Sequence, residues 1–136
     1  MFNGQKYQIE TGGGPLVVRV QARRTSNWRI VVVDPAGGSV VLSTWTQVVF
    51  SFRLRPFDSA LFAQRVASLV GVGGATVNVL FPKSTWDGIP WDYSMRERTI
   101  WMDVLLNGVT EQFALEDVQG NRVFPVRVAS SILGLP

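Results

Sequence analysis

The acid–base chemistry open to this sequence rests mainly on carboxylates, because the chain contains no histidine and no cysteine. It therefore lacks the commonest general base near neutral pH and the commonest zinc ligand. Disulfides, thiolate metal sites and thiol nucleophiles are excluded as well. Without histidine and cysteine, an enzymatic function has little support in the sequence.

The spacing of those acidic side chains does not indicate a reaction. A glycosidase needs two carboxylates that flank one bond, and no such pair stands out among Asp87, Asp92, Glu97 and Asp103. The alternating Asp/Asn pattern of a calcium-binding loop is absent. We expect these carboxylates to be solvated or ion-paired. The sequence thus predicts a protein that is not an enzyme, with no catalytic, metal-binding or cofactor-binding residue.

Two glycine clusters, at 12–14 and 71–74, invite comparison with phosphate-binding loops. Such a loop must follow a strand and open a helix, so that backbone N–H groups face the phosphate. The first cluster opens a predicted strand and the second ends a predicted helix. We interpret both as turn and cap glycines.

Residues 83–97 form a predicted loop rich in aromatic and acidic side chains. Trp86, Trp91 and Tyr93 alternate there with Asp87 and Asp92. Flat rings and carboxylates are the means by which proteins bind sugars, and Trp and Tyr are also typical of protein contacts. The third interpretation is that the rings fold back and plug one end of the core.

Arginines dominate the basic residues, and several fall on the polar faces of predicted strands. A shared face would create a basic patch for an acidic partner or a nucleic-acid backbone. Phe50 and Phe52 point away from Arg53 and Arg55, however, which disfavours a platform for stacking bases. A nucleic-acid partner stays possible but is not favoured. The arginines of this predicted patch are Arg19, Arg23, Arg24, Arg53 and Arg55.

Charge is scarce and unevenly divided along the chain. Only 17% of the 136 residues are charged, against about 25% in a typical domain, and 46% are hydrophobic. Residues 1–68 hold eight basic and three acidic groups, a balance of +5, whereas residues 69–136 hold five basic and seven acidic, a balance of −2. The low share of charge favours a surface partly hidden by a partner. The uneven division can reflect nucleic-acid contact or a head-to-tail assembly in which unlike faces meet.

Alternation of apolar and polar residues predicts strands through most of the chain. The expected strands cover residues 16–22, 28–32, 40–42, 48–54, 77–81, 100–106, 109–115 and 124–128, with a tight reversal at 34–38. The length fits one domain, 1–136. The fold class predicted is mainly β, an antiparallel barrel or sandwich, with one short α-helix and a C-terminal β-meander.

The single α-helix is expected at about residues 58–70, after Pro56 closes the preceding strand. A helical stripe is formed by Phe62, Val66, Leu69 and Val70. Either Asp58 or Ser59 is the candidate N-cap, and Gly71 is the candidate C-cap.

The hairpin is expected around Asn107-Gly108, a strong signal for a two-residue turn. A second reversal at 116–121 would lead into the last strand of a three-strand meander. The facing pairs this turn predicts are Leu106 with Val109, Met102 with Phe113, and Ile100 with Leu115.

No signal peptide and no membrane-spanning segment are expected. The N-terminal residues lack a basic stretch followed by an apolar run. Two uncharged segments, 36–52 and 66–82, are interrupted by polar residues or glycines and do not resemble spanning helices.

Taken whole, the chain resembles small virion structural proteins of tailed bacteriophages, such as head cement, connector, tail or baseplate subunits. The likeness lies in the glycine-punctuated start, the Asp34-Pro35-Ala36-Gly37-Gly38 and Asn107-Gly108 turns, and the apolar C-terminal tail. It implies a virion protein, made in the host cytoplasm, that assembles in many copies and carries no catalytic residue.

The function we expect is therefore that of a non-enzymatic structural subunit, with copies of itself and other structural proteins as partners and no membrane. The alternatives are a carbohydrate-binding module that uses the aromatic loop and a nucleic-acid-binding β-domain. The predicted contact residues are Trp86, Trp91 and Tyr93 in the loop, Arg19, Arg23, Arg53 and Arg55 on strands, and Ile132, Leu133 and Leu135 in the tail.

Overall fold

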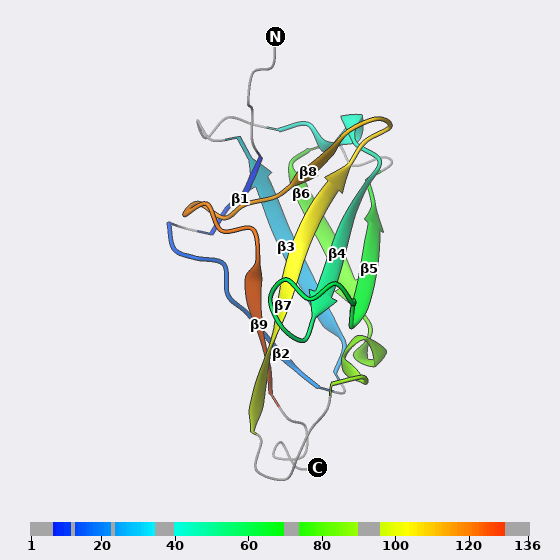
Figure 1. The fold of residues 1–136 in the computed structure, drawn as a ribbon. Helices are drawn as coiled ribbons and strands as arrows, with labels where there is room; N and C mark the ends of the chain where they lie inside the picture. Colours follow the sequence, from blue (N-terminus) through cyan, green and yellow to red (C-terminus); the bar gives the residue numbers. More distant parts are fainter. Residues whose placement is uncertain are drawn as a thin grey trace.

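The computed structural model of the chain describes residues 7–11, 13–22, 24–34, 40–69, 74–89 and 96–129 (Figure 1). These residues form strands and two short 3-10 turns, and no α-helix occurs in the described ranges. The elements are β1 (Gln8–Ile9), β2 (Val18–Gln21), β3 (Ser26–Val33), η1 (Leu42–Thr44), β4 (Gln47–Arg53), β5 (Ala63–Ser68), β6 (Thr76–Phe81), η2 (Lys83–Trp86), β7 (Glu97–Asn107), β8 (Gln112–Ala114) and β9 (Phe124–Ala129).

The strands make two sheets that curl toward one another. The larger sheet has the order β2-β9-β7-β4-β5, with β8 also paired to β7, and the smaller has the order β1-β3-β6. All pairings are antiparallel except β2 with β9. The sheets meet at Glu116, which bridges to Gln8 and accepts a 2.8 Å hydrogen bond from the Ile9 amide. The result is a half-barrel with an open sandwich arrangement, which confirms the predicted fold class.

The core forms because apolar residues alternate on the inward faces of the strands. Val48, Phe50 and Phe52 on β4 have no exposed surface, and β7 and β9 bury their own alternating residues against them. The aromatic rings of this core meet mostly edge to face, a geometry that aromatic pairs prefer. The predicted alternation is confirmed on β6 and β9, whereas Val18 of β2 and Trp28 of β3 are only half-buried. The buried inward residues of β6 and β9 are Val77, Val79, Phe81, Phe124, Val126 and Val128.

The predicted helix at 58–70 is wrong. Residues 63–68 are β5, which pairs antiparallel with β4, for example Val66 opposite Val49. The ladder continues past both ends of the strand, since the Phe62 amide donates to the Phe52 carbonyl at 2.7 Å and the Leu69 amide to the Thr46 carbonyl at 2.9 Å. Pairing with β4 gives this segment a ladder of backbone hydrogen bonds along one of its edges, and this overrides a short helical stripe. The candidate C-cap Gly71 lies outside the described residues.

The hairpin exists, but its predicted turn and register are wrong. Leu106 faces Phe113 instead of Val109, so the loop between β7 and β8 holds residues 108–111. The pairing has slipped by four residues, an even number, and the apolar face is therefore kept. An aromatic contact fixes the observed register, because Phe113 packs against Tyr7 and Trp45 at 5.3 and 5.8 Å between ring centroids.

The last three strands also differ from a simple meander. β9 pairs with β7, not with β8, as in Ile100 opposite Val126. β8 and β9 both run antiparallel to β7 and occupy successive parts of one of its edges. The segment at 116–121 leaves that edge and rejoins it with the direction of the chain unchanged, so the predicted second reversal is wrong. The expected strand at 40–42 is absent, and Leu42 instead begins η1. The reversal at 34–38 lies mostly outside the described residues.

Candidate interaction surface

The first aromatic residue of the loop predicted as a contact surface lies in the core. Trp86 is 1% exposed at the end of η2, so its proposed role as a contact residue is wrong. Its ring lies 6.4 Å from Trp28 in a stacked arrangement and 5.3 Å from Phe52 edge to face. The third interpretation, a ring that folds back to close the core, describes Trp86 correctly. Trp91 and Tyr93 lie outside the described residues.

The predicted arginine patch divides between two places. Arg53 ends β4, whereas Arg19 lies on β2 and faces Arg127 of β9. Arg24 shares a pocket with Arg19, and Arg55 is exposed in the loop after β4. The sheet order separates β2 from β4 by two strands, which the sequence did not reveal. Four predicted contact residues, Arg23, Ile132, Leu133 and Leu135, lie outside the described residues.

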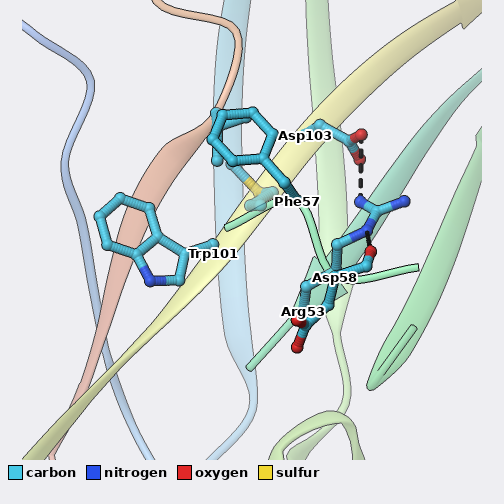
Figure 2. A pocket seen from close by; sticks show the side chains of 7 residues that line it. Arg53, Phe57, Asp58, Trp101 and Asp103 are labelled. Atoms are coloured by element: carbon cyan, nitrogen blue, oxygen red, sulfur yellow. Dashed lines mark hydrogen bonds and ion pairs between the residues drawn. The ribbon is translucent and has the colours of Figure 1, made fainter. Parts of the chain in front are cut away.

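A pocket of about 260 Å³ lies on the outer face of the larger sheet (Figure 2). Two paired strands and two loops build it: β4 and β7 from the sheet, the loop at 54–62, and the segment before β9. Because Arg53 and Trp101 are opposite one another in the β4–β7 ladder, both reach the same face. The lining residues are Arg53, Phe57, Asp58, Trp101, Met102, Asp103 and Val123.

The guanidinium of Arg53 ties the loop to the sheet. Its Nη1 lies 3.1 Å from Oδ2 of Asp103 on β7, and its Nε donates a 2.7 Å hydrogen bond to the backbone carbonyl of Asp58. Both contacts appear in Figure 2. Asp103 is the diagonal neighbour of Arg53 in the ladder, within reach of a long side chain. One side chain therefore holds the loop in a defined place beside the pocket.

Phe57 is the unusual residue of this loop. The Asp58 amide donates to the Arg55 carbonyl at 3.3 Å and closes a four-residue turn, with Pro56 second and Phe57 third. The φ of Phe57 is 66°, and among the described residues no other non-glycine residue has a positive φ. A turn with proline at its second position and a positive φ at its third has the pattern of a type II turn. The third position of such a turn normally holds glycine or asparagine. A left-handed backbone costs an ordinary residue roughly 1–2 kcal/mol.

The strained turn presents the Phe57 ring to solvent. The residue is 86% exposed, while Trp101 and Val123 beside it are half-buried. Val66 lies on the same face of the sheet and is 53% exposed. We call Phe57, Trp101 and Val123, with the Arg53–Asp103 pair, the Phe57 surface. Sequence reasoning missed Phe57, because Pro56 announces a turn but nothing in the sequence says that the next residue adopts a positive φ.

The Phe57 surface combines an exposed apolar ring with a fixed ion pair. Its one carboxylate on the sheet, Asp103, is neutralised by Arg53. Within the ranges that the structure describes, no group of three or more acidic, histidine or cysteine side chains is placed to hold a metal ion. An apolar ring next to a fixed ion pair suits a partner that offers an apolar pocket and polar groups at its rim.

None of the helical segments that the structure describes is long and apolar enough to cross a membrane.

No protein-family model matches the chain, and no curated protein shows significant similarity to it.

Proposed function

We propose that this protein is a non-enzymatic structural subunit of a multi-copy assembly, and that the Phe57 surface contacts a neighbouring copy. The observation that carries the proposal is the exposed ring of Phe57 on a left-handed backbone. In an isolated chain this arrangement costs free energy twice, through the backbone and through the exposed apolar surface. Burial of the ring in a neighbour offsets both costs.

The way in which the ring is held supports the same role. Arg53 fixes the loop through Asp58 and Asp103, so little conformational freedom is lost when the ring docks. Aromatic side chains at the centre of an interface frequently carry most of its binding energy. The low share of charged residues in the chain is consistent with a surface that neighbours cover.

The assembly we propose is the virion of a tailed bacteriophage, with other structural proteins as further partners. This part rests on the overall likeness of the sequence to small head, connector, tail and baseplate proteins. The carbohydrate-binding alternative loses support because Trp86 is buried.

The proposal is tested by the mass of the full chain in solution, measured by sedimentation velocity over a range of concentrations. We expect oligomers whose share grows with concentration, and an association at least about tenfold weaker for Phe57→Ser. Leu80→Ser is the matched control, since Leu80 is 56% exposed on the other sheet. A wild-type chain that stays monomeric at every concentration, or a Phe57→Ser chain that associates like wild type, contradicts the proposal.

A further inference from the structure

A second pocket, of about 350 Å³, lies at one end of the larger sheet and is basic. It forms where β2 and β9 lie beside the start of β7, the lower end of that strand in Figure 1. Arg19 and Arg127 are opposite one another in the parallel β2–β9 ladder, and both are exposed. Arg24, Thr25 and Ser26 add a third guanidinium and two hydroxyls, and Glu97 is the one acidic lining residue.

The three guanidinium groups of this basic pocket are not neutralised within the described part of the chain. No ion pair or side-chain hydrogen bond there involves Arg19, Arg24 or Arg127. Two like charges directly across a ladder destabilise a sheet, so the Arg19–Arg127 pair weakens the isolated fold. A carboxylate placed between them would relieve the repulsion, and it would suit the bidentate geometry that arginine offers.

The opposite end of the same sheet carries the complementary charge. The loop at 108–111 joins β7 to β8, and it exposes Glu111 together with Val109, which is 88% exposed. A 2.8 Å hydrogen bond from the Gly108 amide to the Glu111 carbonyl keeps the loop tight. The described segments that meet at this end, 33–34, 40–47, 74–76 and 107–113, contain Asp34 and Glu111 and neither lysine nor arginine.

A single strand, β7, connects the basic pocket to the acidic loop at 108–111. β7 begins with Glu97 in the basic pocket and ends with Asn107, immediately before the acidic loop. Its 11 residues span roughly 35 Å at about 3.3 Å per residue. Figure 1 shows β7 running between the β2–β9 end and the β8 end of the molecule. The basic and acidic ends therefore lie along one axis and point in opposite directions.

We infer that copies of the chain stack head to tail, with the 108–111 loop of one copy in the basic pocket of the next. Glu111 pairs with Arg19 and Arg127 across that junction. Because the two surfaces differ, the contact is heterologous, and repetition gives a ring or an open filament. This inference rests on the proposed multi-copy assembly and specifies how successive copies are oriented in it.

A second copy suits this pocket better than a nucleic-acid backbone does. The lining contains no aromatic side chain on which a base could stack, and Glu97 repels a phosphate. The chain itself offers an exposed carboxylate at the complementary end. Binding of a nucleic acid to this pocket is the alternative outcome of the experiment.

The experiment uses two charge reversals in the full chain, Glu111→Arg and Arg127→Glu, followed by sedimentation velocity at low and moderate salt. Each variant alone sets like charges against each other at every junction, so we expect association at least tenfold weaker than wild type. In an equimolar mixture the reversed loop meets the reversed pocket, and the native loop meets the native pocket. The mixture should therefore recover assembly with alternating copies. Arg29→Glu, an exposed arginine on β3 opposite Asn78, is the matched control and should associate like wild type.

Several results would overturn the inference. Single variants that assemble like wild type would do so, as would a mixture that fails to recover. Binding of a short single-stranded DNA that Arg127→Glu abolishes, with assembly unchanged, would assign the pocket to nucleic acid instead. Loss of assembly in Phe57→Ser but in neither charge variant would leave the proposed function standing and remove only the head-to-tail contact.

Discussion

Two loops of the larger sheet border the same pocket and are stabilised in opposite ways. The loop at 54–62 contributes Phe57, and the loop at 116–123 contributes Val123. The first points an apolar ring outward on a strained backbone, whereas the second turns a carboxylate inward and surrounds it with donors. The loop at 116–123 thus contributes to the fold through its buried carboxylate, whereas the loop at 54–62 leaves its aromatic ring exposed.

The inward carboxylate belongs to Asp117, which has no exposed surface. Its Oδ1 accepts hydrogen bonds from the Gln119 and Asn121 amides, both at 2.9 Å. Its Oδ2 accepts from the Asn121 side chain at 2.9 Å and from the Leu16 amide at 3.2 Å. Burial acts to raise the pKa of Asp117, but the hydrogen bonds outweigh it and lower the pKa below the usual 3.8. A carboxylate so fully paired stabilises the turn and ties it to the segment before β2.

The outward loop lacks such an internal network. Arg53 holds it through one hydrogen bond to Asp58, an ion pair with Asp103 anchors Arg53 to the sheet, and the Phe57 ring stays exposed. Removal of the Asp117 carboxylate from the loop at 116–123 should therefore destabilise the fold. Removal of the Phe57 ring from the loop at 54–62 should instead weaken association.

The largest effect is expected for Asp117→Ala. Four hydrogen bonds to a buried carboxylate would be lost, so we expect the free energy of unfolding to fall by about 3 kcal/mol. Urea denaturation measures the change. Asp87→Ala, at an exposed position, is the control and should cost less than about 0.5 kcal/mol. Equal effects of the two substitutions would break the contrast between the loops.

The lowered pKa of Asp117 gives a second, smaller effect that depends on pH. Between the folded-state pKa and 3.8, the unfolded chain binds more protons at this group than the folded chain does. The stabilisation is therefore fully present above that window and is lost as the pH falls through the folded-state pKa. The unfolding free energy of wild type should drop more steeply below pH 3.8 than that of Asp117→Asn. Parallel curves for the two proteins would show that Asp117 does not carry this dependence.

The smallest effect on stability is expected for Phe57→Gly. Glycine removes a left-handed strain of about 1–2 kcal/mol but adds about 0.5–1 kcal/mol of backbone entropy to the unfolded chain. The net result should be a slight gain, about 0.5 kcal/mol, by urea denaturation, together with weakened association by sedimentation. A clear loss of stability would mean that the ring supports the fold itself, and the distinction between the two loops would disappear.

The strands were predictable where burial alone decides the pattern. Val48, Phe50 and Phe52 alternate and are all buried, because one face of β4 meets the core. The segment around Val66 was not predictable, since its strand exists only because β4 leaves an edge free. The hairpin register likewise depends on Phe113 meeting Tyr7 from the other end of the chain.

The candidate sites were less predictable than the strands. The sequence indicated that arginines and aromatic residues matter, but their grouping depends on strand order. Arg127 joins Arg19 only through the parallel β2–β9 pairing. Trp86, the first aromatic residue of the predicted loop, is drawn into the core by Trp28 and Phe52. Phe57 is defined by a backbone angle that no local pattern encodes for phenylalanine.

The parallel pairing of β2 with β9 has a consequence for the order of folding. Val18 and Val126 are partners although more than a hundred residues separate them, so this pairing closes the longest loop among the strand pairs described. Contacts of such high sequence separation form slowly, and during synthesis they must wait until the later strand has been made. The basic pocket is therefore completed late, after the core strands β4 and β7 have met. If copies stack as inferred above, a nascent or truncated chain that lacks β9 has no complete docking site and is kept out of the stack.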